Sequence, residues 1–150
     1  MTYTPCDPTR DETLWRSPIE VKLVASAVLC DPDGRILIAK RPEGKSLAGY
    51  WEFPGGKVKQ HESPEACLVR ELHEELGVET HTSCLSPLSF ASHRYETFHL
   101  LMPLYVCRNW HNPPRGKEGQ EVKWIRPKEI MQYEMPAAND GLKIAVRDHF

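Results

Sequence analysis

The chain has 150 residues, of which 40% are hydrophobic and 27% are charged, and its formal net charge is −2. This length predicts about one domain, large enough to bury a core without disulfides or a structural metal. So balanced a charge excludes coating of nucleic acid by a broadly basic surface, and we expect no nucleic-acid polymer as a partner.

The cysteines and the apolar runs indicate the compartment. The five cysteines lie far apart in the sequence, and none has the Cys/His spacing of a zinc site. We therefore expect reduced thiols and a cytoplasmic protein. The first residues show no apolar segment typical of a secretory signal, and no run approaches the roughly 18 residues of a membrane span. No membrane association is expected.

In chain order, residues 1–18 are polar and without periodicity, which predicts a tail ahead of one domain over residues 19–150. Residues 21–30 are apolar and β-rich, and residues 35–39 repeat that character after the turn Asp31-Pro32-Asp33-Gly34. The two runs predict a β-hairpin with a loop of about four residues.

A helix is predicted from Pro64 to Leu76. Ser63 can cap its first turn, Pro64 suits the first helical position, and Gly77 is a natural residue just past its end. Apolar residues recur at helical spacing on one side, which we expect to be buried.

The remaining chain predicts further strands over residues 88–93, 99–107 and 121–125, with Pro103 as a local flaw in the second of them. A helical turn over residues 127–131 and a terminal helix over residues 139–150 follow. Because helices interleave with the strands, we expect α/β layers about one mixed sheet.

Three glutamates crowd one patch of the predicted helix. Glu71, Glu74 and Glu75 have the spacing i, i+3, i+4, so their like charges repel, and they lie near the end of the helix dipole that disfavours anions. Such local conflicts mark functional sites, and a hard divalent cation would resolve this one. On these three residues alone, a metal site and a merely solvated acidic face both stay open.

The residues around this patch extend it into a longer motif. Gly56, five residues, Glu62, seven residues and then Arg70-Glu71-Leu72-His73-Glu74-Glu75-Leu76-Gly77-Val78 follow one another without a gap. This arrangement resembles the signature of the Nudix hydrolases, enzymes that cleave a diphosphate linked to another group.

The resemblance implies a Nudix-type α/β/α sandwich around a mixed β-sheet, with Mg²⁺ as cofactor and Mn²⁺ as a possible substitute. By analogy the metal ligands are a backbone carbonyl of Gly55 or Gly56 and the carboxylates of Glu71, Glu74 and Glu75. Arg70 would hold Glu71, our choice of general base, and Glu62 would support them, so that the implied catalytic set is Arg70, Glu71, Glu74 and Glu75.

Within the family the chain resembles the MutT-like branch, which removes damaged nucleoside triphosphates. Three segments carry this: the lead-in Trp51–Lys57 with Glu52 and Phe53, the acidic loop Gly116–Gln120 with Glu118 as a further metal ligand, and Met135–Asn139. The Asn139 amide could read a base edge, since it offers both a donor and an acceptor.

Each assignment has a plain alternative. Asn139 could simply cap the terminal helix. Phe53 could be a core aromatic rather than a wall for the base, and Glu118 could be solvated. Arg41 resembles a phosphate-contacting arginine of this branch, but it could also be an ordinary surface arginine.

The expected activity is conversion of 8-oxo-dGTP to its monophosphate and pyrophosphate, with CTP or another nucleoside triphosphate as the alternative substrate. A non-catalytic nucleotide-binding module with the same fold is a third hypothesis, although such modules usually lose the acidic signature. The sequence does not decide the oligomeric state, which could be a monomer or a homodimer.

Overall fold

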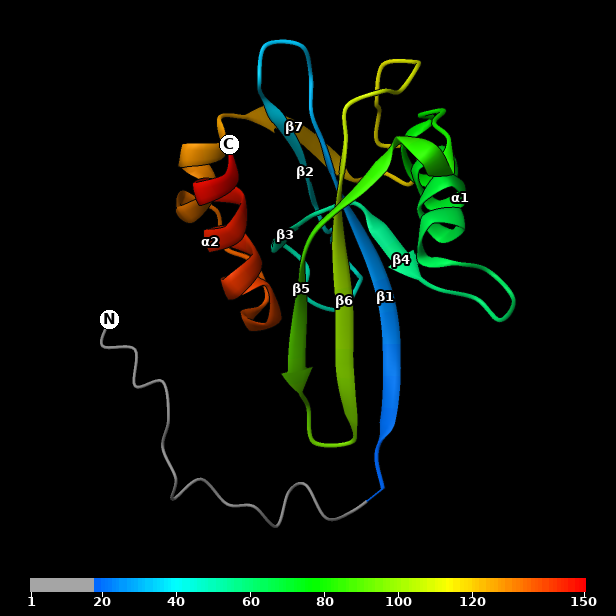
Figure 1. Ribbon diagram of the computed structural model, residues 1–150. Helices are drawn as coiled ribbons and strands as arrows, with labels where there is room; N and C mark the ends of the chain where they lie inside the picture. Colours follow the sequence, from blue (N-terminus) through cyan, green and yellow to red (C-terminus); the bar gives the residue numbers. More distant parts are fainter. Residues whose placement is uncertain (1–17) are drawn as a thin grey trace.

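The computed structural model describes residues 18–150, so the predicted tail lies outside the described residues except for Pro18. The strands of this part form two sheets (Figure 1). One sheet has the order β4-β1-β6-β5, with bounds Gly55–Lys57, Glu20–Leu29, Phe98–Cys107 and Leu85–Arg94. The other has the order β3-β2-β7, with bounds Trp51–Glu52, Ile36–Lys40 and Glu121–Ile125.

Two helices cover the sheets from opposite sides (Figure 1): α1 (Pro64–Leu76) and α2 (Asp140–His149). Strand β2 alternates between them, since Ile36 and Ile38 pack in the cluster under α2 while Leu37 packs in the cluster under α1. Both faces are therefore apolar and covered, and the predicted mixed α/β class is confirmed. The four-stranded sheet is itself mixed, because β1 runs parallel to β6 and antiparallel to β4.

The predicted bounds of α1 and its terminal signals are confirmed. The Ser63 hydroxyl accepts a hydrogen bond from the Ala66 N–H at 3.0 Å, and Pro64 occupies the first turn. Gly77 has a φ of 72°, and its N–H and that of Val78 bond to carbonyls of the last turn. Local sequence chemistry thus fixes both ends of the helix that carries the glutamates.

The predicted hairpin over residues 21–39 is wrong. A single bridge, Cys30 with Ile36, joins the two strands, after which β1 and β2 separate into different sheets. The turn itself forms, with the Asp31 carboxylate accepting from the N–H groups of Asp33 and Arg35. The strands part because β1 finds its partners in β4 and β6, and β2 in β3 and β7. For the same reason the strands divide into two sheets rather than the one we expected.

The flaw predicted at Pro103 is present. Pairing of β1 with β6 is interrupted between Leu23–Leu101 and Ser26–Leu104, opposite the proline that lacks an N–H. On its other edge, β1 pairs with β4 over Val24–Ser26. Short 3-10 turns complete the fold: η2 (Thr82–Cys84), η3 (Pro127–Gln132) and η4 (Ala137–Asn139). Among residues 18–150, the helices are too short or too polar to cross a membrane.

Candidate active site

A cavity of about 330 Å³ opens where the two sheets diverge beside the C-terminal end of α1. It collects residues from β1 to β4, α1, β6, η4 and the segments that connect these elements. Its lining is Val24, Ser26, Ala39, Arg41, Pro42, Lys45, Glu52, Phe53, Gly55, Gly56, Lys57, Glu75, Met102, Glu118, Gln120, Pro136 and Asn139. Of the predicted residues, Arg70, Glu71 and Glu74 do not line it directly but lie beside it on α1.

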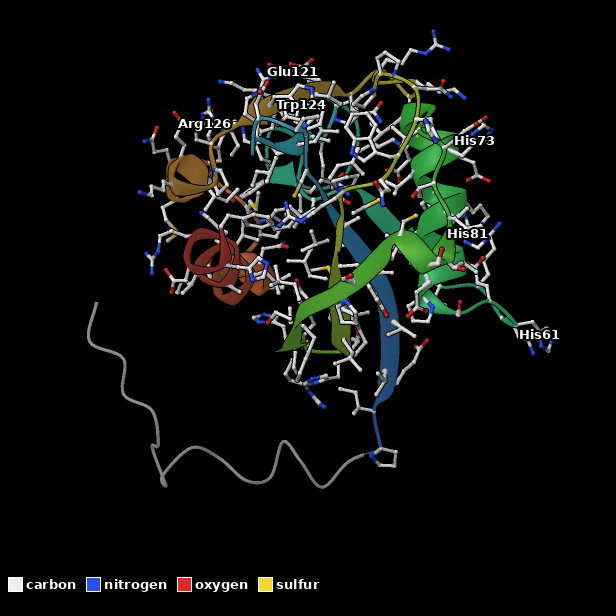
Figure 2. All side chains as sticks on the ribbon, turned by 45° about the horizontal axis from the view of Figure 1, so that its top comes forward. His61, His73, His81, Glu121, Trp124 and Arg126 are labelled. Carbon is white, nitrogen blue, oxygen red and sulfur yellow. The ribbon has the colours of Figure 1, made fainter. Side chains whose placement is uncertain are left out.

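Histidines take no part in this lining. In Figure 2, His61, His73 and His81 lie on the outer surface on the α1 side, and all three are exposed. The charged groups that converge on the cavity within the described residues are carboxylates, a guanidinium and amines.

Arg70 holds three carboxylates at the side of the cavity. Its guanidinium donates to Glu62 at 2.6 Å and 3.1 Å, to Glu71 at 2.7 Å and to Glu74 at 3.4 Å. The hydrogen bonds from Arg70 and from the Lys59 N–H lower the pKa of Glu62 to about 2. The predicted pairing of Arg70 with Glu71 is thus present, and Glu62 anchors the far side of the guanidinium.

The two glycines before α1 allow close packing at different places. A Cβ on Gly56 would lie 2.5 Å from the Glu71 carboxyl carbon, so the Glu71 carboxylate rests directly against the backbone. A Cβ on Gly55 would lie 2.0 Å from the Ala25 carbonyl oxygen on β1, and Gly55 has a φ of 154°. Gly56 therefore makes room for a side chain, whereas Gly55 makes room for a neighbouring strand.

The ladder between β1 and β4 directs the carbonyls of these glycines differently. Pro54 accepts from the Ala27 N–H at 2.9 Å, and Leu23 accepts from the Val58 N–H at 3.1 Å. Ala25 and Gly56 lie midway, so they form the next hydrogen-bonded pair of the antiparallel ladder. Gly55 is a non-bonded position on an edge strand, so its carbonyl faces away from β1.

Among the glutamates of the signature motif, which the structure describes in full, Glu75 is the one without a cationic partner. Burial, together with its hydrogen bond to Glu71 and the charges of Glu71, Glu52 and Glu118, raises the pKa of Glu75 to about 9. Without a cation, we therefore expect Glu75 to keep its proton to a higher pH than an ordinary glutamate does. The repulsion predicted from the helical spacing is present in the fold, and Glu52 and Glu118 add to it.

The loop that carries Glu118 is docked on the end of α1. Its N–H groups at Arg115 and Lys117 donate to the carbonyls of Leu76 and Glu75 at 3.1 Å and 3.0 Å. These are carbonyls of the last turn, which lack partners within the helix. Glu118 is thereby brought to the cavity, although its side chain is exposed.

The cavity is also lined by Phe53 and Asn139. Phe53 is 4% exposed and belongs to the core under α2, so it is both a core aromatic and a wall of the cavity. Asn139 is 7% exposed, and its side chain makes no capping hydrogen bond to α2. The capping alternative for Asn139 is therefore wrong, and its amide is available to the cavity.

Arg41 is neither free nor simply solvated. Its guanidinium bonds to the Glu52 carboxylate at 3.0 Å and to the Ser46 carbonyl at 2.7 Å. The pair joins the loop over residues 41–49 to β3 at the mouth of the cavity. The sequence did not predict the bond to Ser46, nor Lys45 and Met102 as lining residues, because nothing in their local sequence indicates a site.

The carboxylates fit a hard divalent cation by their chemistry. Glu71 and Glu75 share a hydrogen bond beside Glu52 and Glu118, and the donors are all oxygen. In the described residues no three acidic, cysteine or histidine side chains are already arranged around one metal position. Glu71 and Glu74 are directed instead at Arg70.

The comparisons with known proteins agree with this geometry. The NUDIX domain model matches residues 25–143. The chain belongs to the Nudix family. It is 38% identical over 118 residues to a CTP pyrophosphohydrolase of Escherichia coli, covering 75% of this chain and 82% of the relative. It is 36% identical over 96 residues to an 8-oxo-dGTP diphosphatase of Proteus vulgaris, covering 64% and 84%.

A solved structure shows the same arrangement of elements. This structure comes from work on MutT from Aliivibrio salmonicida and Vibrio cholerae, with a TM-score of 0.74, 31% identity and coverage of 87% of this chain and all of the other. The predicted membership of the MutT-like branch of Nudix hydrolases is confirmed. The chain is a hydrolase of phosphoric anhydrides.

The two glycines predict opposite effects of alanine. In Gly56→Ala the new methyl displaces the Glu71 carboxylate, which is the end of a side chain rather than backbone, so we expect activity on a nucleoside triphosphate to fall about 100-fold while the melting temperature changes little. In Gly55→Ala the methyl meets backbone, so we expect a loss of roughly 2 kcal/mol or more of stability. Equal stability losses in both variants, or full activity in Gly56→Ala, would contradict this assignment.

Glu75 predicts a pH dependence of stability in the metal-free protein. Between its ordinary pKa of 4.5 and about 9, the folded state binds a proton that the unfolded state lacks. Unfolding free energy should therefore decrease as pH rises through this window, by at most about 1.4 kcal/mol per pH unit from this group. Urea titrations at several pH values in the presence of a chelator measure this decrease, with the Glu75→Gln variant as the comparison. If the unfolding free energy of the wild type depended on pH no more than that of the variant, Glu75 would be ionised without metal.

Proposed function

We propose that this protein is a Mg²⁺-dependent nucleoside triphosphate pyrophosphohydrolase whose preferred substrate is 8-oxo-dGTP. The observation that carries the proposal is one cavity lined by two chemically different sets of groups. The first set is carboxylates that repel one another, and the second is a buried, uncommitted amide together with an aromatic side chain. The first set suits a cation with phosphates, and the second suits a base.

The residues that would hold the cation are Gly55 through its carbonyl and Glu71, Glu74, Glu75 and Glu118 through their carboxylates. When bound, Mg²⁺ would offset the charge of the phosphate chain and make a water molecule more acidic, and Mn²⁺ could substitute for it. The Gly55 carbonyl is favoured over that of Gly56, which is occupied in the ladder and accepts from the Cys67 thiol at 3.4 Å.

Glu71 is our candidate for the general base. Its carboxylate is held between the Arg70 guanidinium at 2.7 Å and the backbone of Gly56, which leaves it little freedom to rotate. A base must lie within hydrogen-bond reach of the proton it removes, and a fixed carboxylate meets this requirement better than a mobile one. Glu74, at 53% exposure, is less constrained.

Recognition of the base is assigned to Asn139 and Phe53. The amide can donate and accept at once, so it can pair with a purine edge, and Phe53 offers an apolar surface in the same cavity. Arg41 would act on the phosphate chain from the mouth of the cavity, held by Glu52. The relative from Proteus vulgaris, an 8-oxo-dGTP diphosphatase, supports an oxidised purine.

The second candidate substrate is CTP, favoured by the similarity to the CTP pyrophosphohydrolase of Escherichia coli. The chemistry at the phosphates would be the same, and only the base would differ. A non-catalytic binding module is not proposed, because the acidic signature is complete. We propose the cytoplasm as the place of action, consistent with the buried free thiols of Cys30, Cys67 and Cys107.

A panel of nucleotides tests this function. With Mg²⁺, we expect faster release of pyrophosphate from 8-oxo-dGTP than from dGTP or CTP, and no turnover in a chelator. Asn139→Ala should reduce the preference for 8-oxo-dGTP over dGTP about tenfold or more, since a hydrogen-bonding partner of the base is lost. Asn109→Ala, an exposed asparagine outside the cavity, is the matched control.

The same panel separates the alternatives. Faster turnover of CTP than of 8-oxo-dGTP would assign the second substrate. Hydrolysis of 8-oxo-dGTP no better than of dGTP would rule out the preferred one.

A further inference from the structure

The side chain of Gln120 connects the acidic loop to the helix that carries the glutamates. Its Nε2 donates to the Glu75 carbonyl at 3.1 Å, and its Oε1 accepts from the Glu118 N–H at 2.8 Å. Both polar ends of one amide are therefore used. Its partners are the backbone groups of the two residues whose carboxylates meet in the cavity.

Other contacts of the loop over residues 115–120 also restrict its movement relative to α1. The Glu75 carbonyl also accepts from the Lys117 N–H at 3.0 Å, so two donors of the loop converge on one carbonyl. At Gly116 a Cβ would lie 1.8 Å from the Gln120 carbonyl oxygen, which shows how tightly the loop folds back on itself. The N–H of Lys117 fixes the start of the loop to α1, whereas the side chain of Gln120 links the Glu118 N–H to the same helix end.

We propose that Gln120 is a positioning residue that holds the Glu118 carboxylate at the cation site opposite Glu75. This inference rests on the proposed function, in which both carboxylates bind the cation. Glu118 is exposed, and among residues 18–150 no hydrogen bond or ion pair fixes its side chain, so the direction of its carboxylate depends on how well its backbone is held. Partners that orient metal ligands typically change metal affinity by 10- to 100-fold when they are removed.

The length and chemistry of glutamine both matter to this bridge. The span needs one donor and one acceptor at the end of a three-bond side chain. Gln120→Met keeps the length and removes both hydrogen bonds. Gln120→Asn keeps both groups but is one methylene shorter, so it cannot reach both partners.

The experiment measures Mn²⁺ affinity of the substrate-free protein by electron paramagnetic resonance, with Mn²⁺ as the probe. We expect Gln120→Met to bind Mn²⁺ about tenfold more weakly with little change in melting temperature. Gln132→Met, at an exposed glutamine on η3, is the matched control and should bind as the wild type does. In a Glu118→Gln background, Gln120→Met should weaken binding no further, because Gln120 acts through Glu118.

A second measurement needs no metal. In the metal-free protein, the Glu118 amide should exchange with solvent faster in Gln120→Met and in Gln120→Asn than in the wild type. Unchanged exchange in both variants, or an equal loss of Mn²⁺ affinity in the Glu118→Gln background, would overturn the role of Gln120. Absence of Mn²⁺ binding by the wild type would instead overturn the proposed function. If Gln120→Met does not fold, Gln120→Asn replaces it in the measurements of Mn²⁺ affinity and of amide exchange, with the same expected results.

Discussion

The guanidinium of Arg70 is the contact on which the rest of the site depends. It neutralises Glu62 and Glu71 at 2.6 Å and 2.7 Å and reaches Glu74 at 3.4 Å, so one cation serves three carboxylates of the signature. Glu75 is left without such a partner and faces Glu52 and Glu118. This uneven neutralisation produces a fixed carboxylate beside one that keeps its proton until a cation arrives.

The scaffold makes this arrangement possible by close approaches of backbone. Gly56 lets the Glu71 carboxylate rest on β4, and Gly55 lets β4 lie against β1. The loop over residues 115–120 uses the unpaired carbonyls at the end of α1, and so joins the chain that carries Glu118 to the helix that carries Glu75. The same helix end that disfavours the glutamates electrostatically thus anchors the loop that completes the site.

Features that depend on residues close together in the sequence were predicted, whereas features that depend on residues far apart in the chain were not. Helix α1 was predicted at both ends, because Ser63 and Gly77 act within one turn. The predicted pairing of β1 with β2 was wrong, because strands far along the chain compete for the same edges. The crowding of Glu71 and Glu75 was evident from helical spacing. The bridge through Gln120 and the uncommitted amide of Asn139 required the tertiary structure, since both depend on what a side chain does or does not touch.

The most direct test of the central claim is isothermal titration of Mg²⁺ into the protein with a non-hydrolysable triphosphate analogue, in two buffers of different ionisation enthalpy. We predict uptake of the divalent ion with release of close to one proton at neutral pH, because Glu75 must ionise to bind it. Loss of that proton release in Glu75→Gln would support the assignment. Binding without proton release in the wild type, or no uptake of the ion at all, would contradict the account.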